Sequence, residues 1–535
     1  MSWSENIRKA ALYLEHNMEN TMNSVGISGL AAYLPPYRTN LEDWCGWTDG
    51  SWEKLRDVVG HSFRMRGHHQ NVYTMAANAV LRLIKQYNID PRTVGFFAFG
   101  TESSTDNSAG AVIVKGIVDK GLKKLGLPAL SRNCEVPEYK HACLGGVYAL
   151  KGAARFLACD GAQSKAIVVA ADIAEYERGS TGEPTQGAGA VAMLLEAKPK
   201  LLEIKLQKSG SSADYRGPDF RKPFVRFAQQ NASTNTQLRD FPVFNGYYST
   251  NCYIDAVLLA LNNMFNKCGL DRAEYLKQLG AIFLHRPYAR MPETGLAISY
   301  LFALALGKAE DHAELKEYCD AARVKFHDVI EEFNAARNLF DLVEQGKMNS
   351  PVFPKAMRTI RVLPRFESFK RIQEKMALGS ELMKNVGNLY SAALPAWIAA
   401  GLEDAQQSGV DLTGQEILTL GYGSGDAAEA IPMQVVEGWQ EHAKKIRFAS
   451  AFEGAVDLSE NQYIALHSGR QPVDLPMDTE GEFFISRIGK NSGGDFDEDG
   501  IEYYGFGASA NTKSGEKSDK SQKNNDSFNQ VTNEV

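Results

Sequence analysis

The chain has no long apolar run and no large excess of charge of either sign. Both absences exclude classes of binding partner. No uninterrupted apolar stretch approaches the ~20 residues that a membrane-spanning helix needs, so we expect no membrane partner. A net charge of -7 over 535 residues offers no basic field for nucleic acid. The N-terminus lacks the basic, apolar and small-residue order of a secretory signal, so we expect a cytoplasmic protein.

Cysteine is also scarce, and its pattern excludes two kinds of site. The seven cysteines are an odd number scattered through a long chain, which argues against a disulfide framework and for a reducing compartment. The sequence contains no CxxC pair and no HExxH. We therefore expect no metal site.

What is present is a globular composition, 44% apolar and 23% charged, in a chain too long for one ordinary domain. Short apolar runs alternate with amphipathic segments, which predicts an α/β fold with buried strands and right-handed parallel connections. The expected strands are Val94–Phe99, Ala166–Ala171, Ala281–Leu284 and Glu416–Tyr422. The expected helices are Val72–Tyr87, Val147–Cys159, Asn251–Cys268 and Ala393–Gln407.

A weak internal repeat predicts two similar halves. The glycine turn and apolar run that begin at Gly187 are echoed from Gly423 onward. We place the first half at residues 24–205 and the second at 206–507.

Three segments fall outside this repeat. Residues 1–23 read as an added amphipathic helix, and residues 508–535, which have few large apolar side chains, as a disordered tail. Residues 301–375 read as a helical insertion in the second half. Its long charged helical run, Ala313–Gln345, is expected to present a solvated face.

The strongest local signal is the segment His141-Ala-Cys143-Leu-Gly-Gly. A cysteine just before Gly-Gly and a helix places its sulfur at a helix N-terminus, which favours the thiolate. The glycine amides could form an oxyanion hole. The alternative reading is an inert buried cysteine.

Glu102 and His285 each follow an apolar strand directly. Ligands collect at the carboxyl ends of strands in α/β sheets, where a partly desolvated carboxylate can act as a general base. Asn388 and the Gly423-Ser424-Gly turn add hydrogen-bond donors at two more strand ends. Together these residue types match carbon–carbon bond formation through an acyl-thioester on Cys143.

These motifs resemble those of the hydroxymethylglutaryl-CoA synthases of the thiolase-like superfamily, from about Val25 to Gly505. The resemblance implies a thiolase-like five-layered αβαβα fold made of two similar halves. It implies that Cys143 is the acylated nucleophile, Glu102 the acid/base and His285 the catalytic histidine. It also implies substrate-binding residues and supporting residues, namely Ser249, Arg290, Asn388 and Ser424, and Asp172, Thr185 and Asp214.

By the same resemblance, the reaction joins acetyl-CoA to acetoacetyl-CoA and releases 3-hydroxy-3-methylglutaryl-CoA for the mevalonate route to isoprenoids. No cofactor is expected, and analogy predicts a homodimer. Arg290 would meet CoA, with a structural ion pair as its alternative role.

Departures from the family pattern leave the acyl carrier open. Leu144 stands where eukaryotic members usually carry tyrosine, and Thr294 replaces a second basic residue near CoA. The carrier could be acyl carrier protein, as in polyketide β-branching enzymes. A second alternative is a ketoacyl-ACP-synthase-like enzyme that uses Cys143, His285 and Asn388. A third is a dinucleotide-binding protein, suggested by the glycines from Gly187, although an apolar strand and not a helix is expected after them.

Overall fold

The computed structural model describes residues 24–104, 109–219, 241–243, 245–335, 338–472, 474–490 and 497–507. The expected leading helix over 1–23 and the expected tail over 508–535 lie outside these residues.

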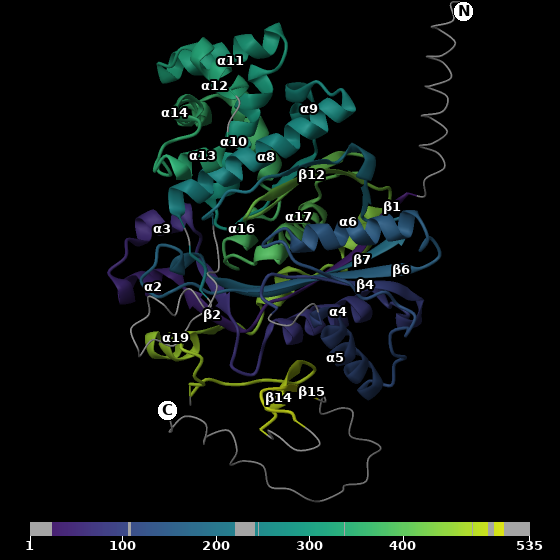
Figure 1. Cartoon of the computed structure of the whole chain (residues 1–535). Helices are drawn as coiled ribbons and strands as arrows, with labels where there is room; N and C mark the ends of the chain where they lie inside the picture. The colour runs from purple at the N-terminus through teal and green to yellow at the C-terminus, as the bar shows by residue number, and fades with distance from the viewer. Residues whose placement is uncertain are drawn as a thin grey trace, which may run out of the picture.

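One large mixed sheet runs through the molecule and joins its two halves (Figure 1). Within the described ranges its strand order is β10-β11-β12-β8-β1-β7-β6-β4-β5, with β9 beside β12. The strands are β1 (Val25–Tyr33), β4 (Val94–Gly100), β5 (Glu138–Tyr139), β6 (Lys165–Ala174), β7 (Gly187–Ala197), β8 (Leu202–Ile204), β9 (Gly210–Ala213), β10 (Ala281–Leu284), β11 (Glu416–Gly423) and β12 (Ala427–Val435). All four strands expected from apolar runs are confirmed.

Strand direction is only partly as expected. β4 pairs in parallel with β5 and β6, and β10 with β11. β7 instead runs antiparallel to both β1 and β6, and β12 runs antiparallel to β11. The expected parallel pairing is therefore found for some strands and not for others, because β6 to β7 and β11 to β12 are short returns with no crossover α-helix. The glycine-led run from Gly187 is a strand, which removes the basis for a dinucleotide fingerprint.

Helices cover both faces of the sheet and fill the space between the halves (Figure 1). α4 and α5 pack on the outer face of the first half, α6 and α17 lie in the middle, and α8 packs on β11 and β12. The helices are α4 (Val72–Tyr87), α5 (Gly110–Lys124), α6 (Gly145–Ala158), α8 (Gly246–Cys268), α10 (Arg290–Ala305) and α17 (Ala393–Ser408). This is the expected order of five alternating layers.

Strand β8 connects the halves at the backbone level. It pairs with β1 through Gly26 and Ile27, and with β12 through Met433 to Val435. The expected boundary at residue 205 falls directly after this strand. The two halves thus share one hydrogen-bonded sheet.

The expected long charged helix over Ala313–Gln345 is instead three short helices. These three helices are α11 (Ala309–Ala322), α12 (Phe326–Asn334) and α13 (Leu339–Glu344). The helical insertion continues with α14 (Pro354–Thr359) and α15 (Glu367–Gln373). Arg323 ends α11 in the left-handed region, at φ 54°. Tyr318, Val329 and Phe333 are buried, so the segment packs on the second half and is not simply a solvated face.

The remaining elements are smaller and lie at the periphery. They are β2 (Tyr37–Asn40), β3 (Ser62–Met65), β13 (Val456–Asp457), β14 (Phe483–Ile488), β15 (Glu502–Phe506), α2 (Leu41–Thr48), α3 (Trp52–Val58), α9 (Arg272–Gln278), α16 (Ser380–Met383), α18 (Trp439–Ala443) and α19 (Glu460–His467). None of the helices within the described ranges is long and apolar enough to cross a bilayer.

Candidate active site

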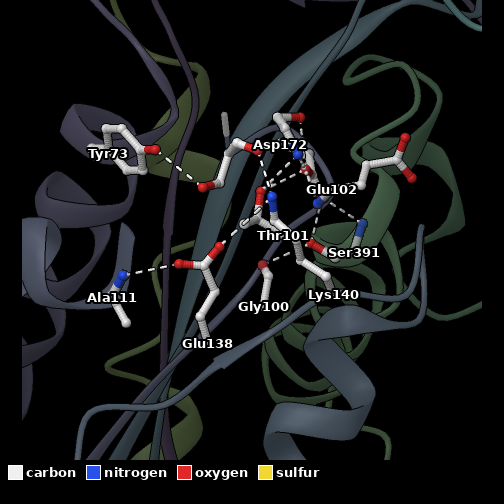
Figure 2. Close-up of polar contacts among 11 residues, drawn as sticks. Tyr73, Gly100, Thr101, Glu102, Ala111, Glu138, Lys140, Asp172 and Ser391 are labelled. Carbon is white, nitrogen blue, oxygen red and sulfur yellow. Dashed lines mark hydrogen bonds and ion pairs between the residues drawn. The ribbon is translucent and has the colours of Figure 1, made fainter. Parts of the chain in front are cut away.

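Glu102 follows β4 and is held in place through its backbone. Its amide donates to Oδ1 of Asp172 on β6 at 2.8 Å, and the amide of Ser103 donates to the same oxygen at 3.0 Å. The Ser391 amide donates to the other Asp172 oxygen at 2.9 Å. Figure 2 shows the Glu102 carboxylate extending away from this cluster. Asp172 therefore fixes the backbone of Glu102, while the Glu102 side chain points away from Asp172.

Asp172 is fully buried, and its surroundings shift the pKa of its carboxyl group in two opposite directions. Burial raises the pKa of its carboxyl group, while hydrogen bonds from Ser391 and Ser103 lower it. The hydrogen-bond donors come from the segment after β4 and from the segment before α17. This carboxylate therefore connects the two halves of the chain. The structure thus places Asp172 where a supporting role was expected.

Strand β5 leads into the nucleophile segment and also anchors the loop that follows Glu102 (Figure 2). The Lys140 ammonium donates to the carbonyl of Ser104 at 2.5 Å. The buried Glu138 carboxylate accepts from the amide of Ala111, in the first turn of α5, at 3.2 Å. Neither role was expected from the sequence, because each depends on a long-range contact without a motif.

Cys143 and Glu102 are brought together as predicted. The Cys143 thiol lies 3.8 Å from Oε2 of Glu102, within the range of a hydrogen bond to sulfur. Ala142 has φ 42°, in the left-handed region, so the chain turns sharply just before the nucleophile. A Cβ on Gly146 would stand 2.6 Å from the carbonyl oxygen of Ser391, so glycine is required for this close approach.

The prediction that the helix N-terminus keeps Cys143 as a thiolate was wrong. Burial, followed by the charges of Glu102 and Asp172, raises the pKa of Cys143 well above its usual value. Helix α6 begins two residues later, at Gly145, so its dipole is outweighed. In the resting site Cys143 is a thiol that faces Glu102.

His285 lies at the end of β10, as predicted. Its amide donates to the carbonyl of Leu420 at 2.7 Å, and the Tyr253 hydroxyl donates to the carbonyl of His285 at 3.1 Å. Within the described part of the chain, its buried Nε2 has no hydrogen-bond partner. Burial lowers the pKa of His285 to about 3, so the imidazole is neutral at neutral pH.

Strand β11 links Cys143 to His285. A Cβ on Gly423 would stand 2.5 Å from the carbonyl oxygen of His141, so β11 runs directly against the nucleophile segment. The preceding residue of the strand, Tyr422, places its ring 6.2 Å from the His285 ring, centroid to centroid. The site is thus assembled from both halves of the chain.

Two tyrosines near the nucleophile were not predicted as site residues. Tyr176 and Tyr390 are buried and pack with Cys143 in one small apolar cluster. The amide of Asn388 donates to the carbonyl of Thr185 at 3.1 Å, and its side-chain oxygen accepts from the Tyr390 amide at 2.9 Å. Both tyrosines stand inside the motif segments, and that position was the available signal.

The remaining predicted substrate-binding residues lie on the His285 side. Ser249 is buried on α8, one turn before Tyr253, and its hydroxyl has no partner among the described residues. Ser424 lies half-buried in the turn between β11 and β12. Arg290 is exposed at the start of α10, with no carboxylate of the described chain within 4.0 Å. The alternative ion pair for Arg290 therefore has no partner in the described residues.

Asp214 does not join Glu102 and Cys143 in any described contact. It is exposed, and its carboxylate lies 3.5 Å from Nε of Arg216. Two buried carboxylates on this side, Asp219 and Asp426, were not predicted as site residues. Asp219 accepts from the Tyr422 hydroxyl at 3.0 Å, while burial and the charge of Asp219 raise the pKa of Asp426 to about 8.

Asp219 and Asp426 also form the one group that is close enough to hold a cation in the part of the chain the structure describes. Their oxygens and the Cys252 sulfur all lie within 4.8 Å of one another. Because its pKa is raised to about 8, Asp426 retains a proton at neutral pH.

Two family profiles cover most of the chain. The profile for the hydroxymethylglutaryl-coenzyme A synthase N-terminal region matches residues 21–200, and that for the C-terminal region matches residues 236–465. A hydroxymethylglutaryl-CoA synthase of Enterococcus faecalis is 26% identical over 465 residues, which cover 86% of this chain and 96% of the relative.

Solved structures show the same fold. MvaS in complex with 3-hydroxy-3-methylglutaryl coenzyme A has a TM-score of 0.68 at 24% identity, covering 91% of this chain and 99% of that one. The curacin pathway HMG synthase in complex with holo donor-ACP has a TM-score of 0.63 at 18% identity, covering 90% and 100%. The thiolase-like fold is thus confirmed, and the chain belongs to the hydroxymethylglutaryl-coenzyme A synthase family of enzymes.

Proposed function

We propose that the chain condenses acetyl-CoA with acetoacetyl-CoA to give 3-hydroxy-3-methylglutaryl-CoA. The observation that carries the proposal is the contact between the Cys143 thiol and the Glu102 carboxylate, 3.8 Å apart, in a site that β11 connects to a buried neutral His285. A thiol, a carboxylate and an imidazole in this arrangement suit an acyl-thioester reaction.

The reaction begins with acyl transfer. The Cys143 sulfur attacks the acetyl carbonyl, and the thiol proton is transferred to the departing CoA sulfur, so CoA leaves as the free thiol and Glu102 remains a carboxylate. Glu102 then takes a proton from the acetyl methyl group, which becomes the carbon nucleophile. This order needs no thiolate at rest, in keeping with the raised pKa of Cys143.

The second substrate meets the His285 side of the site. The acetyl carbanion adds to the ketone carbon of acetoacetyl-CoA, and the ketone oxygen gains the proton that Glu102 removed from the methyl group. Because His285 is neutral, it polarises the ketone by donating a hydrogen bond from its ring and not as an imidazolium. Water then cleaves the thioester to Cys143, which frees the product and restores the thiol.

We further propose that Ser249, Asn388, Ser424 and Arg290 contact the thioester substrates, with Asp172 and Thr185 in supporting roles. The unpartnered Ser249 hydroxyl and the exposed Arg290 guanidinium support this assignment. Thioester acidity and oriented donors carry the chemistry, so we propose that no cofactor is required. A cytoplasmic homodimer in the mevalonate route is proposed from family resemblance, and light scattering tests the dimer.

Incubation with acetyl-CoA and acetoacetyl-CoA, followed by thiol release, tests the proposal. Peptide mass spectrometry is expected to find acetyl on Cys143 in the wild type and in Glu102→Gln, with condensation lost in Glu102→Gln. A ketoacyl-ACP-synthase-like enzyme would condense normally without Glu102. Normal turnover by Cys143→Ala would sink the assignment.

An acyl-carrier-protein donor is the second candidate, favoured by the fold shared with the curacin pathway enzyme and by the exposed Arg290. The two candidates are separated by comparing Cys143 acetylation rates with acetyl-CoA and with acetyl-loaded carrier protein at equal concentration. Faster transfer from the carrier protein would reassign the donor and keep the chemistry.

A further inference from the structure

A cavity of about 370 Å³ lies between the start of α10, the α15 to α16 segment and α17. Its buried lining consists of Arg286, Ala289, Met376 and Trp397, and its exposed rim includes Glu293 and Lys370. At ~30 Å³ per water molecule, this space corresponds to about a dozen waters, which suits a small organic molecule.

Arg286 is the unusual member of this lining. It is 5% exposed, and its guanidinium stands over the Trp397 ring, 5.1 Å from the centroid. In the residues that the structure describes, it has no hydrogen-bond acceptor and no carboxylate within 4.0 Å. Burial lowers its pKa to about 10, while Glu293 and Glu381 act on it only from a distance, so it stays charged at neutral pH.

The other buried cationic side chains of the described chain each contact a carboxylate or a carbonyl oxygen. Lys151 contacts Glu429 at 2.6 Å, Arg216 contacts Asp255 at 2.8 Å, and Arg64 donates to the carbonyl of Pro35 at 3.1 Å. A buried charge without such a partner is costly to keep. Arg286 thus carries a cost that an anionic ligand in the cavity would offset.

We propose that this cavity binds a small monocarboxylate, with its carboxylate on Arg286 and its apolar body against Ala289, Met376 and Trp397. The planar guanidinium suits a carboxylate through two parallel hydrogen bonds. None of the lining residues is among the proposed catalytic or substrate-binding residues, and the proposal does not rest on the proposed function.

Binding is tested on the full chain with 3-methylbutanoate as the probe and its uncharged amide, 3-methylbutanamide, as the matched control. Ligand-observed NMR and calorimetry give the dissociation constants. We expect saturable binding of the acid, at least roughly tenfold weaker binding of the amide, and loss of acid binding in Arg286→Met. Saturating desulfo-CoA should not displace the acid, because the cavity lining contains none of the proposed substrate contacts.

A second variant keeps the test decisive if Arg286→Met fails to fold. Glu293 is exposed at the rim and acts on Arg286 through its charge, so Glu293→Gln should fold and bind the acid a few-fold more tightly. Equal affinity for acid and amide, no saturable binding at millimolar acid, unchanged affinity in Glu293→Gln, or displacement by desulfo-CoA would each overturn the proposal.

Discussion

At the scale of single residues, the resting state of Cys143 sets the order of events in the site. Its thiol is buried beside Glu102, whose negative charge disfavours a second negative charge on sulfur. We expect Glu102→Gln to lower the pKa of Cys143 and to speed its alkylation by iodoacetamide at neutral pH. Peptide mass spectrometry over a pH series gives the rate at Cys143 separately from exposed Cys159.

Glu138→Gln is the matched control for that experiment. Glu138 is also a buried carboxylate close in sequence, but it does not contribute to the pKa shift of Cys143. Its alkylation profile should follow the wild type. An unchanged or slower rate in Glu102→Gln would contradict the charge argument.

A second prediction concerns His285 and the pH dependence of folding stability. Its pKa is about 3 in the folded chain against the usual 6.5, so below pH 6.5 the unfolded chain binds a proton that the folded chain does not. Stability therefore falls as pH drops through this range. Replacement by Gln should reduce the stability lost between about pH 7 and pH 5 by about 2 kcal/mol, measured by urea unfolding at both pH values.

His442→Gln serves as the comparison, because His442 is less buried and its pKa is lowered less far. A loss of stability in His285→Gln equal to that of the wild type across the same pH interval would show that His285 is not the group responsible.

At the scale of elements, β5 couples the nucleophile to its base. The strand leads to Cys143, and the ammonium of Lys140, the residue directly after the strand, donates to the carbonyl of Ser104, two residues after Glu102. We expect Lys140→Met to lower kcat roughly tenfold, to leave KM little changed, and to speed amide hydrogen exchange at Glu102 and Ser103. Steady-state kinetics and exchange mass spectrometry provide the two measurements.

Lys316→Met is the control, because Lys316 is an exposed lysine in an i,i+4 pair with Asp320 on the inserted helices. It should change neither quantity. If Lys140→Met lowers kcat without faster exchange near Glu102, then Lys140 acts by its charge and not by holding the loop.

At the scale of the whole molecule, a buried ion pair fastens the central layer to the second half. Lys151 on α6 contacts Glu429 on β12 at 2.6 Å, and both side chains are under 5% exposed. Lys151→Met leaves the Glu429 charge buried without its cation, although the Ser211 hydroxyl still contacts the carboxylate, and should cost about 3–5 kcal/mol of unfolding free energy in urea titration.

The double variant Lys151→Met with Glu429→Leu should recover much of that loss, because it removes the unpaired charge along with its partner. A double variant no more stable than the single one would show that the pair contributes through its shape and not through its charge.

Much of the architecture could be predicted because strands that are buried on both faces have continuous apolar sequences. Such sequences occur in β4, β6, β10 and β11. Strand direction could not be predicted, since the glycine-led run of β7 fits either a crossover or a return. The helices over 313–345 were misread because their many charges concealed Tyr318 and Val329, which face the core.

The site was predicted by residue type and position but not by its electrostatics. Glu102, Cys143 and His285 follow strand or helix signals that are local in sequence. Depth of burial is a property of the assembled fold, so the thiol form of Cys143 could not be deduced from a helix N-terminus. Asp426 meets Asp219 only after residues some two hundred positions apart are brought together.

The contact between Gly423 and the carbonyl of His141 has a consequence for biosynthesis. The wall beside Cys143 is supplied by a strand made 280 residues later, so the nucleophile segment leaves the ribosome long before its cover. At ~5–20 residues per second, this interval is on the order of tens of seconds. During that time Cys143 lacks the burial that raises its pKa, so the nascent chain carries a more reactive thiol than the finished enzyme.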